Sequence, residues 1–236
     1  MTWQGKSVLA VIPARGGSKS IPRKNLVKLG GISLVGRAAK LALSLPWIDH
    51  VVLSTDDEEI ADEGRLHGLD VPFMRPAELA DDKANSIEMW SQVWLEAEEY
   101  YGICFEYSLL LEPTSPLRRS EDVERTIQVL VEGNHGAAAT FSRTPAHYTP
   151  HKTLTIDSEG KVGFYLPEGA RHSLRQSIPP YYHRNGICYA VRRDTLIEHA
   201  SIIERDCAAV VIGRYVVNID DEFDLDIARM LIATSI

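Results

Sequence analysis

The chain has 236 residues, a length suited to one large α/β domain. Its 33 acidic and 25 basic residues leave a net charge of −8, which argues against non-specific binding to nucleic acid or to an anionic membrane surface. We therefore expect any anionic substrate to be held by a local cluster of basic residues.

The N-terminal stretch does not have the pattern of a secretory signal. Lys6 is followed by an apolar run that ends at Pro13, and no segment approaches the ~18 apolar residues of a membrane span. The three cysteines, Cys104, Cys188 and Cys207, are widely spaced and form no CxxC motif. We expect a cytoplasmic protein with free thiols, bound neither to a membrane nor to nucleic acid.

In the first part of the chain, apolar runs of strand length alternate with apolar residues at helical spacing. Strands are predicted at Ser7–Ile12, His50–Ser54, Val71–Met74, Tyr107–Leu111 and Gly136–Phe141. Helices are predicted over Leu34–Leu45 and Asp57–Leu66, then after a cap at Asn85 or Ser86 and after a cap at Ser120. This alternation predicts an α/β fold with a mostly parallel sheet and helices on both faces.

The stretch Thr144–Asn185 interrupts the alternation. It is rich in Pro, His, Tyr and Arg, and its two short β-like pieces, Lys152–Ile156 and Val162–Tyr165, flank a Ser-Glu-Gly turn. It is too short and too polar for a core of its own. We interpret residues 144–185 as an arm inserted in a single domain spanning residues 1–236, which either folds back over the site or packs on a partner subunit.

The predicted pattern resumes after the arm. Strands are expected at Gly186–Val191, Val210–Ile212 and Tyr215–Ile219. The last helix carries Phe223, Ile227, Met230 and Leu231 on one face.

Three unusual loops, Pro13–Asn25, Arg75–Ser86 and Glu112–Ser120, follow predicted strands at the sheet edge where open α/β folds bind ligands. The first has two adjacent glycines, which allow backbone N–H groups to turn toward an anion. Its four cations lie within ten residues: Arg15, Lys19, Arg23 and Lys24. This favours a polyphosphate cradle, although the spacing is neither that of a P-loop nor GxGxxG. The alternative is a solvated basic loop.

The second and third loops each allow two interpretations. The second could present backbone groups and a hydroxyl to a nucleobase, or could be a plain connection that ends in a helix cap. In the third, Glu112 follows a buried strand, where metal ligands and catalytic groups occur. Glu112 could instead pair with Arg118 or Arg119.

Near the C-terminus, Asn218 and Asp220 alternate along a predicted strand and therefore point to the same side. Such an oxygen pair suits Mg²⁺, which takes few protein ligands. Alternatively, Asp220 or Asp221 caps the last helix.

The arm is rich in groups that could clamp the carboxylate and hydroxyls of a sugar acid. They are Lys152, Arg171, Arg175, Gln176, Tyr181, Tyr182, His183, Arg184 and Asn185. His183 could exchange a proton or have a structural role. No nucleophile elbow, HExxH motif or Ser/His/Asp order stands out, which favours positioning and metal electrostatics over covalent catalysis.

Six segments occur in the order known from one enzyme family: IPARGGSKSIPRKN, STDDEEIA, RPAELADDKANS, LEPTSPLR, RNGICY and NIDDEFDL. From about Val8 to Ala228 the chain resembles the CMP-sialic acid synthetases (acylneuraminate cytidylyltransferases), a group that includes the enzymes for pseudaminic and legionaminic acids. The resemblance implies a Rossmann-like nucleotidyltransferase fold and a homodimer formed through the arm. It also implies Mg²⁺-dependent transfer of CMP from CTP to the anomeric hydroxyl of a nine-carbon sugar acid, with release of pyrophosphate.

Matching motif positions imply roles for individual residues. Catalysis is assigned to Arg15, Lys19, Lys24 and Lys152. Nucleotide binding is assigned to Ala14, Arg15, Gly16, Asn25, Arg75, Ala84 and Ser86, and sugar binding to Glu112, Gln176, Tyr182, His183 and Asn185. Asp220 matches a metal-binding aspartate.

The chain departs from the family at three places. The family usually has Gln where Glu112 stands and Asp where Asn218 stands. We hypothesise that Glu112 and Asp220 share the Mg²⁺ and that the amide oxygen of Asn218 ligates it weakly; the related Kdo cytidylyltransferases also place a carboxylate near the Glu112 position. His183-Arg184, where some sialic acid enzymes have Arg-Pro, leaves the identity of the nonulosonic acid open.

Two other functions stay open. One is a nucleotidyltransferase of the same fold that uses Kdo or another base. The other is a non-catalytic nucleotide- or sugar-binding protein with a degraded metal site, an idea motivated by Asn218. The cationic first loop, Lys152 and Asp220 favour an enzyme.

Overall fold

The computed structural model describes residues 3–81, 85–171 and 174–234. In chain order its strands and α-helices are β1 (Val8–Pro13), β2 (Lys28–Leu29), β3 (Ile32–Ser33), α1 (Leu34–Leu43), β4 (His50–Ser54), α2 (Glu58–Leu66), α3 (Ser86–Tyr101), β5 (Tyr107–Leu110), α4 (Ser120–Glu132), β6 (Ala137–Arg143), β7 (Leu154–Ile156), β8 (Val162–Phe164), β9 (Tyr182–Arg192), α5 (Arg193–Ile197), β10 (Cys207–Val211) and α6 (Glu222–Ala233). Within these ranges no helix is both long and apolar enough to cross a membrane.

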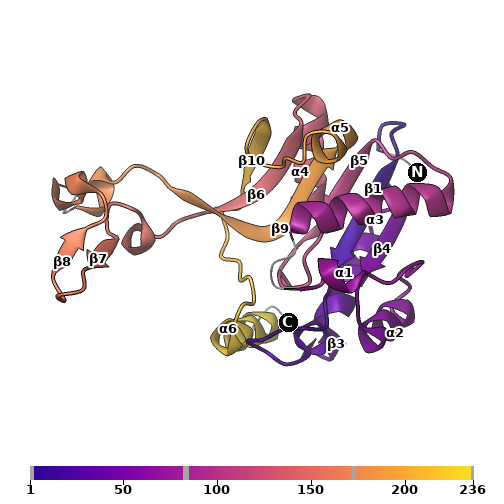
Figure 1. Cartoon of the computed structure of the whole chain (residues 1–236), viewed down its shortest axis with the longest axis horizontal. Coiled ribbons are helices and arrows are strands. Elements are labelled where there is room, and N and C mark those ends of the chain that lie inside the picture. Colours follow the sequence, from indigo (N-terminus) through magenta and orange to yellow (C-terminus); the bar gives the residue numbers. More distant parts are fainter. Residues whose placement is uncertain (1–2, 82–84, 172–173, 235–236) are drawn as a thin grey trace.

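The centre of the molecule is a six-stranded sheet with the order β10-β6-β9-β5-β1-β4 (Figure 1). Strand β9 runs antiparallel to both of its neighbours, and the other pairings are parallel. Alternate residues of β1 bury against α1 and α4 on one face and against α3 on the other. The predicted α/β fold with a mostly parallel, two-sided sheet is confirmed.

Side-chain caps set the starts of the helices that follow β4 and the second loop. The Asp57 carboxylate accepts the N–H of Ile60 at 3.1 Å and begins α2. The Asn85 side chain accepts the N–H of Ile87 at 2.9 Å and begins α3, which decides between the two predicted caps.

The predicted cap at Ser120 is wrong by one position. Ser120 is the first residue of α4, and Arg119 occupies the cap position. The Asp122 carboxylate accepts the Arg119 N–H at 2.8 Å, so a side chain inside the first turn supplies the acceptor.

Two predicted strands do not form. The segment 71–74 follows a single bridge between Val52 and Asp70, and Pro72 lacks the N–H that a longer ladder needs. The segment Tyr215–Ile219 has the alternating burial of a strand, because Val217 and Ile219 pack in a small core beside α6. It lies outside the sheets that the described residues form, and its Ile219 N–H bonds the Thr114 carbonyl.

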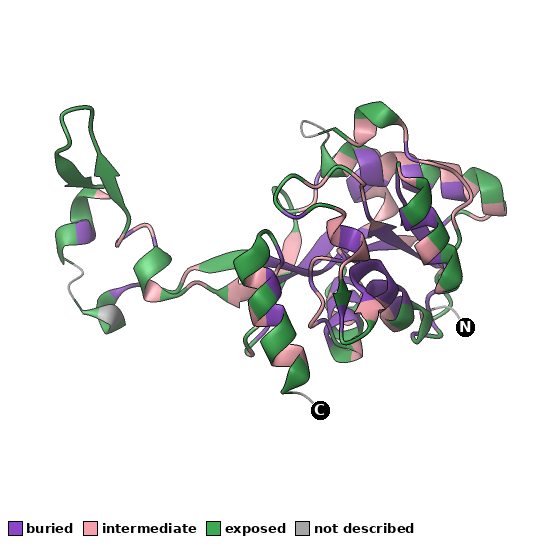
Figure 2. Cartoon of the chain, turned by 90° about the horizontal axis from the view of Figure 1, so that it is seen from below, coloured by how far each residue is buried: buried purple, intermediate pink, exposed green. Residues whose placement is uncertain are grey.

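The inserted arm connects to the sheet through β6 and β9. These two strands stay paired toward the arm as far as Arg143 and Tyr182. At its far end β7 and β8 form a hairpin (Figure 1). Most of the arm is exposed, in contrast to the sheet (Figure 2). The hairpin exposes Leu154, Ile156, Val162, Phe164 and Tyr165. In this chain the arm projects away from the sheet and does not fold back over it (Figure 1).

The last helix buries a face other than the one that the spacing suggested. Leu225 and Ala228 are buried against the core that holds Ile219. Phe223 and Met230 are 72% and 70% exposed. The apolar stripe along α6 is therefore only partly covered by this chain.

Candidate active site

A cavity of about 640 Å³ opens at the carboxyl ends of β1 and β5, a volume typical of small-molecule sites. All three loops singled out in the sequence line it, together with the segment before α6. The predicted residues among its lining are Arg15, Lys19, Lys24, Asn25, Arg75, Ser86, Glu112, Asn218 and Asp220. The loops meet because parallel strands end at one edge of the sheet.

The first loop is closed on itself at its base. The buried Asn25 donates from Nδ2 to the Arg15 carbonyl at 2.9 Å, which joins the two ends of the loop. Ala14 is fully buried, and its N–H continues the sheet by bonding the Ser54 carbonyl at 2.9 Å. The loop therefore leaves a fixed strand end and returns to it.

Gly16 lies against the start of α2 and outside the residues that line the cavity. Its N–H donates to Asp56 Oδ1 at 2.9 Å. A Cβ at this position would lie 2.7 Å from Asp57 Oδ2, closer than real side chains permit. The close approach to Asp57 is thus one physical reason for glycine here.

Three of the four cations of the first loop line the cavity, and Arg23 faces elsewhere. Arg23 is paired with Asp57 and Glu59. Arg15 extends toward the second loop, where Nη1 donates to the Asp81 carbonyl at 2.8 Å. The prediction of a four-cation cradle is therefore corrected: a carboxylate cluster neutralises one member.

Lys24 is partly buried. Its Nζ donates to the Ile219 carbonyl at 2.9 Å, so it joins the first loop to the segment before α6. Burial lowers the pKa of this ammonium group, while the nearby Asp220 carboxylate opposes that shift. This arrangement places a cation beside the candidate metal ligands.

Arg75 anchors the second loop to β4. Its Nε and Nη2 donate to the side chain and the carbonyl of Ser54, at 3.0 and 2.7 Å. Burial lowers the pKa of the guanidinium to about 10. Ser86 lines the cavity as the first residue of α3, and Ala84 lies outside the described residues.

Glu112 stands at the end of β5 with its carboxyl group against the backbone of Gly186. Gly186 has a φ of 68°, and a Cβ there would overlap Glu112 Oε2 and lie 3.2 Å from Asn218 Nδ2. Burial raises the pKa of Glu112, and Asp220 raises it further, while Arg118, Arg184 and Lys24 oppose the shift. Only a glycine lets both side chains rest on β9 here.

Hydrogen bonds show which part of Glu112 Arg118 contacts and which aspartate caps α6. Arg118 donates to the main-chain carbonyl of Glu112, at 2.7 Å, and within the described ranges it forms no ion pair with the Glu112 carboxylate. Asp221 caps α6 by accepting the Asp224 N–H at 3.0 Å. Asp220 is therefore not the cap.

Asn218, Glu112 and Asp220 fit the oxygen chemistry of Mg²⁺. The Oδ1 atom of Asn218 is buried and has no hydrogen-bond partner among the described residues. A buried acceptor of this kind is costly unless something satisfies it, and a cation would do so. The described residues contain no group of three or more His, Cys, Asp or Glu side chains poised for a metal. Two carboxylates and an amide suit an ion that keeps water or phosphate ligands.

The predicted sugar-binding residues of the arm do not line this cavity in the single chain. Lys152 and Gln176 belong to the projecting arm, and Tyr182 is 50% exposed where β9 leaves it. The His183 Nδ1 contacts Thr144 Oγ1 at 3.0 Å.

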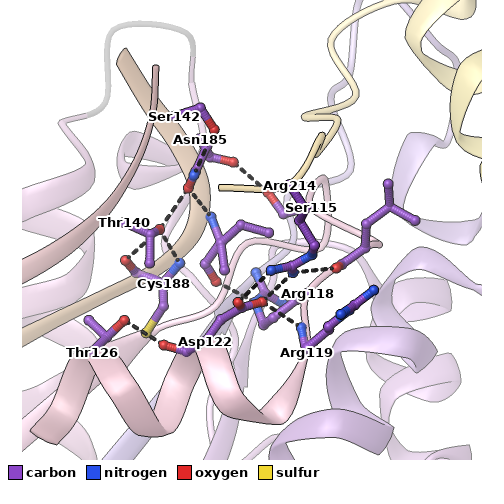
Figure 3. Close-up of polar contacts among 12 residues, drawn as sticks. Ser115, Arg118, Arg119, Asp122, Thr126, Thr140, Ser142, Asn185, Cys188 and Arg214 are labelled. Carbon is purple, nitrogen blue, oxygen red and sulfur yellow. Dashed lines mark hydrogen bonds and ion pairs between the residues drawn. The ribbon is translucent and has the colours of Figure 1, made fainter. Parts of the chain in front are cut away.

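Asn185 is buried and its amide serves β9 itself. Its Oδ1 accepts from the Thr140 hydroxyl at 2.7 Å and from the Ile187 N–H at 3.2 Å, and its Nδ2 donates to Ser142 at 3.1 Å (Figure 3). These bonds support an irregular turn of the strand.

Sequence reasoning missed several residues of the site. Gly186 and Arg118 contact Glu112, and Asp57 contacts the first loop, but none of the three lines the cavity. Each lies within a motif quoted for the family. Met89 and Leu110 add an apolar wall to the cavity. The sequence pattern predicts Leu110 only as a strand residue and does not single out Met89.

Comparisons with known proteins agree with these motifs. The family model described as cytidylyltransferase matches residues 9–207. The chain is 30% identical to a "CMP-N,N'-diacetyllegionaminic acid synthase" of Campylobacter jejuni, over 96% of this chain and 95% of that protein. It is 29% identical to a "pseudaminic acid cytidylyltransferase" of the same species, over 94% of this chain and 95% of that protein.

The name of a third relative refers to flagellin modification. The "post-translational flagellin modification protein B" of Campylobacter coli is 30% identical over 95% of this chain and 94% of its own length. Among solved structures, a CMP:2-keto-3-deoxy-manno-octonic acid synthetase complexed with CTP superposes with a TM-score of 0.72 at 18% identity. The superposition covers 98% of this chain and 100% of that chain, and at this identity it shows a shared fold.

Proposed function

This chain belongs to the cytidylyltransferase family, and on that premise we propose that it transfers CMP from CTP to a sialic-acid-like nine-carbon sugar acid. The names of two relatives, which cover nearly the whole chain, support this class of acceptor. The observation that carries the proposal is the convergence of the cationic first loop with Glu112, Asn218 and Asp220 around one cavity.

In the proposed reaction the anomeric hydroxyl of the sugar attacks the α-phosphorus of CTP in line. A new phosphorus–oxygen bond forms, the bond to the β-phosphate oxygen breaks, the hydroxyl proton is released and pyrophosphate leaves. Arg15, Lys19 and Lys24 line the side of the cavity from which they can neutralise the triphosphate.

We propose that Mg²⁺ is held by Asp220, Glu112 and the amide oxygen of Asn218. When bound, it neutralises charge that develops on the leaving pyrophosphate. The three side chains hold oxygen atoms at the cavity wall, and Gly186 fixes how close Glu112 and Asn218 approach β9.

We also propose a homodimer in which the arm packs on a second copy of the chain. Five large apolar side chains are exposed on and beside the β7–β8 hairpin, and such a surface is unusual on a monomer. The catalytic role of Lys152 and the sugar-binding role of Gln176, Tyr182, His183 and Asn185 stay predictions that depend on where the partner's arm lies. The three cysteines are free thiols, consistent with the reducing cytoplasm proposed as the location.

The test is pyrophosphate release by the purified protein with Mg²⁺. CTP, GTP, ATP and UTP are each combined with N-acetylneuraminic, pseudaminic or legionaminic acid, or with Kdo. Release only with CTP and one nine-carbon acid supports the proposal and names the acceptor. Release with Kdo or with another base keeps the fold and overturns the acceptor or the base. Binding of CTP without release under any combination favours the non-catalytic alternative.

A further inference from the structure

Arg118 is a buried guanidinium that joins the third loop to an irregular turn of β9 (Figure 3). Its Nη2 donates to the carbonyl of Glu112 at 2.7 Å and to that of Gly186 at 3.2 Å, and its Nε donates to that of Ile187. Only 8% of Arg118 is exposed, and this burial lowers its pKa to about 10. One side chain therefore holds the backbone of two segments that are far apart in the sequence.

The turn of β9 exists because the pairing with β6 is interrupted. Ala139 pairs with Tyr189 and Phe141 with Arg184, so β9 contains more residues than β6 over this interval. The hydroxyl of Thr140 accepts the Cys188 N–H at 3.0 Å and bonds Asn185 Oδ1, which fills the gap between the strands. The extra backbone places Gly186 beneath the third loop.

The two segments held by Arg118 meet at the Glu112 side chain. The third loop carries the Glu112 backbone, and β9 lies against its carboxylate. Glu112 is itself one of the residues whose carbonyl accepts from Arg118. Gly186, which accepts from the same nitrogen, is the surface against which Glu112 Oε2 rests. The distance between the Glu112 backbone and the Gly186 backbone thus depends on this guanidinium.

We propose that Arg118 is a positioning residue that sets the orientation of the Glu112 carboxylate toward Asn218 and Asp220 by holding the Glu112, Gly186 and Ile187 carbonyls together. Arg118 does not line the cavity, so it acts through Glu112 and not on the nucleotide. The inference rests on the proposed function only in that Glu112 takes part in the reaction.

The planar fork of arginine is what this role requires. A guanidinium presents several donors in fixed directions, whereas a lysine ammonium is a single point at the end of a flexible chain. Arg118→Lys keeps the positive charge but cannot hold all three carbonyls in the same geometry. Ser115, which donates to the Asn185 carbonyl at 3.0 Å, and Asn185 itself keep the rest of the turn in place.

The test is a double-mutant cycle between Arg118→Lys and Glu112→Gln, read as kcat and KM for CTP. Arg118→Lys is expected to lower kcat by about tenfold or more, with KM for CTP within about threefold, as for a displaced reacting group. In the Glu112→Gln background, the same substitution is expected to change kcat by less than about twofold. Arg119→Ala, a neighbouring arginine with an exposed side chain, is the matched control and should leave both constants unchanged.

Additive losses in the cycle, an unchanged kcat in Arg118→Lys, or a loss confined to KM would each overturn the proposal. If Glu112→Gln has no measurable turnover, the crystal structure of Arg118→Lys decides: a carboxylate displaced from Gly186 supports positioning, and an unmoved one refutes it. If Arg118→Lys does not fold, Arg118→Gln takes its place. Failure of the wild-type protein to use CTP defeats the proposed function, while the crystallographic comparison still tests the role of Arg118.

Discussion

Arg23 donates to both carboxylate oxygens of Asp57, and so ties the far end of the first loop to the first turn of α2. One of the two bonds, from Nη2 to Oδ1, is 3.1 Å long. Asp57 also begins α2 by accepting the Ile60 N–H, and its carboxylate touches the backbone of Gly16. A single carboxylate therefore contacts the start of the loop, its end and the helix behind it.

We expect Asp57→Asn to raise KM for CTP by roughly three- to tenfold, because a paired charge that shapes the loop is lost. The effect on kcat should be smaller, since Arg15, Lys19 and Lys24 keep their charges. Steady-state kinetics with varied CTP would measure both constants. Asp62→Asn, which breaks the exposed pair with Arg65 on the same helix, is the control. Equal changes in the two variants would contradict a role for Asp57 in the loop.

Lys24→Ala should lower kcat by about 10²- to 10³-fold, the usual loss when a cation facing developing charge is removed. The melting temperature should fall only slightly, because among the described residues the Lys24 side chain makes one hydrogen bond, to the Ile219 carbonyl. Kinetics and thermal denaturation of the same preparation would separate the two effects. A melting temperature far below that of the wild type would assign Lys24 to folding instead.

The proposed metal site predicts that Glu112→Gln weakens the dependence of activity on Mg²⁺. The Mg²⁺ concentration for half-maximal rate should rise by about tenfold, since one anionic oxygen ligand is lost. Asn218→Asp should lower that concentration by adding a carboxylate. The affinity of the CTP-bound protein for Mn²⁺, measured by calorimetry, gives a readout that does not need turnover.

Asp226→Asn is the control for this pair of variants. Asp226 is exposed on α6 and paired with Arg229. Its substitution should not change the affinity for Mn²⁺. A Mg²⁺ dependence that is the same in the wild type and in Glu112→Gln would rule out Glu112 as a ligand.

A stability prediction concerns Glu98, which lies away from the cavity. Its carboxylate accepts from Arg193 at 2.9 Å, from the Phe105 N–H at 3.1 Å and from the Trp94 indole at 3.1 Å. Burial alone raises the pKa of Glu98, but the bonds from Arg193 and Phe105 and the Arg193 charge bring it below its usual value. We expect Glu98→Gln to lower the free energy of unfolding by about 1–3 kcal/mol at pH 7.

The same carboxylate gives this effect a defined pH dependence. Because the pKa is lower in the folded protein, the stabilisation is present above the ordinary glutamate pKa of about 4.3 and is lost as the pH falls through the folded value. Urea unfolding at pH 7 and near pH 3 would measure the difference between wild type and Glu98→Gln, which should shrink in acid. Glu99→Gln, its exposed neighbour, should show no such difference.

The proposed dimer predicts how variants in the arm behave. Ile156→Asp places a charge on a hairpin residue that is 73% exposed in the single chain, and should weaken self-association by at least about tenfold if that residue is buried in the dimer. Leu66→Asp alters an equally exposed leucine at the end of α2 and is the control. Sedimentation equilibrium would compare the three proteins. A dimer unaffected by Ile156→Asp, and by deletion of residues 158–170, would exclude the arm as the interface.

Much of the site could be predicted from local patterns. Buried apolar runs located β1, β4 and β5, and the loops after β1 and β5 carry Lys24 and Glu112 to the same cavity. The prediction of the site succeeds because parallel strands of one sheet end at a common edge. Locating each strand therefore also places the loop that follows it. The segments 71–74 and 215–219 failed because an apolar alternation reports burial, and a strand also needs a neighbour with free backbone groups.

Local patterns along the chain were enough to predict the α/β alternation, the inserted arm and the cationic loop, and the ordered motifs were enough to indicate the enzyme family. The tertiary structure alone decided which charges are available. It pairs Arg23 with Asp57, directs Arg118 to main-chain carbonyls instead of to the Glu112 carboxylate, and leaves Asn218 Oδ1 without a partner among the described residues. The reason is physical. Periodicity along the chain records which side of an element is buried, whereas pairing between distant residues depends on distances that exist only after the sheet has formed.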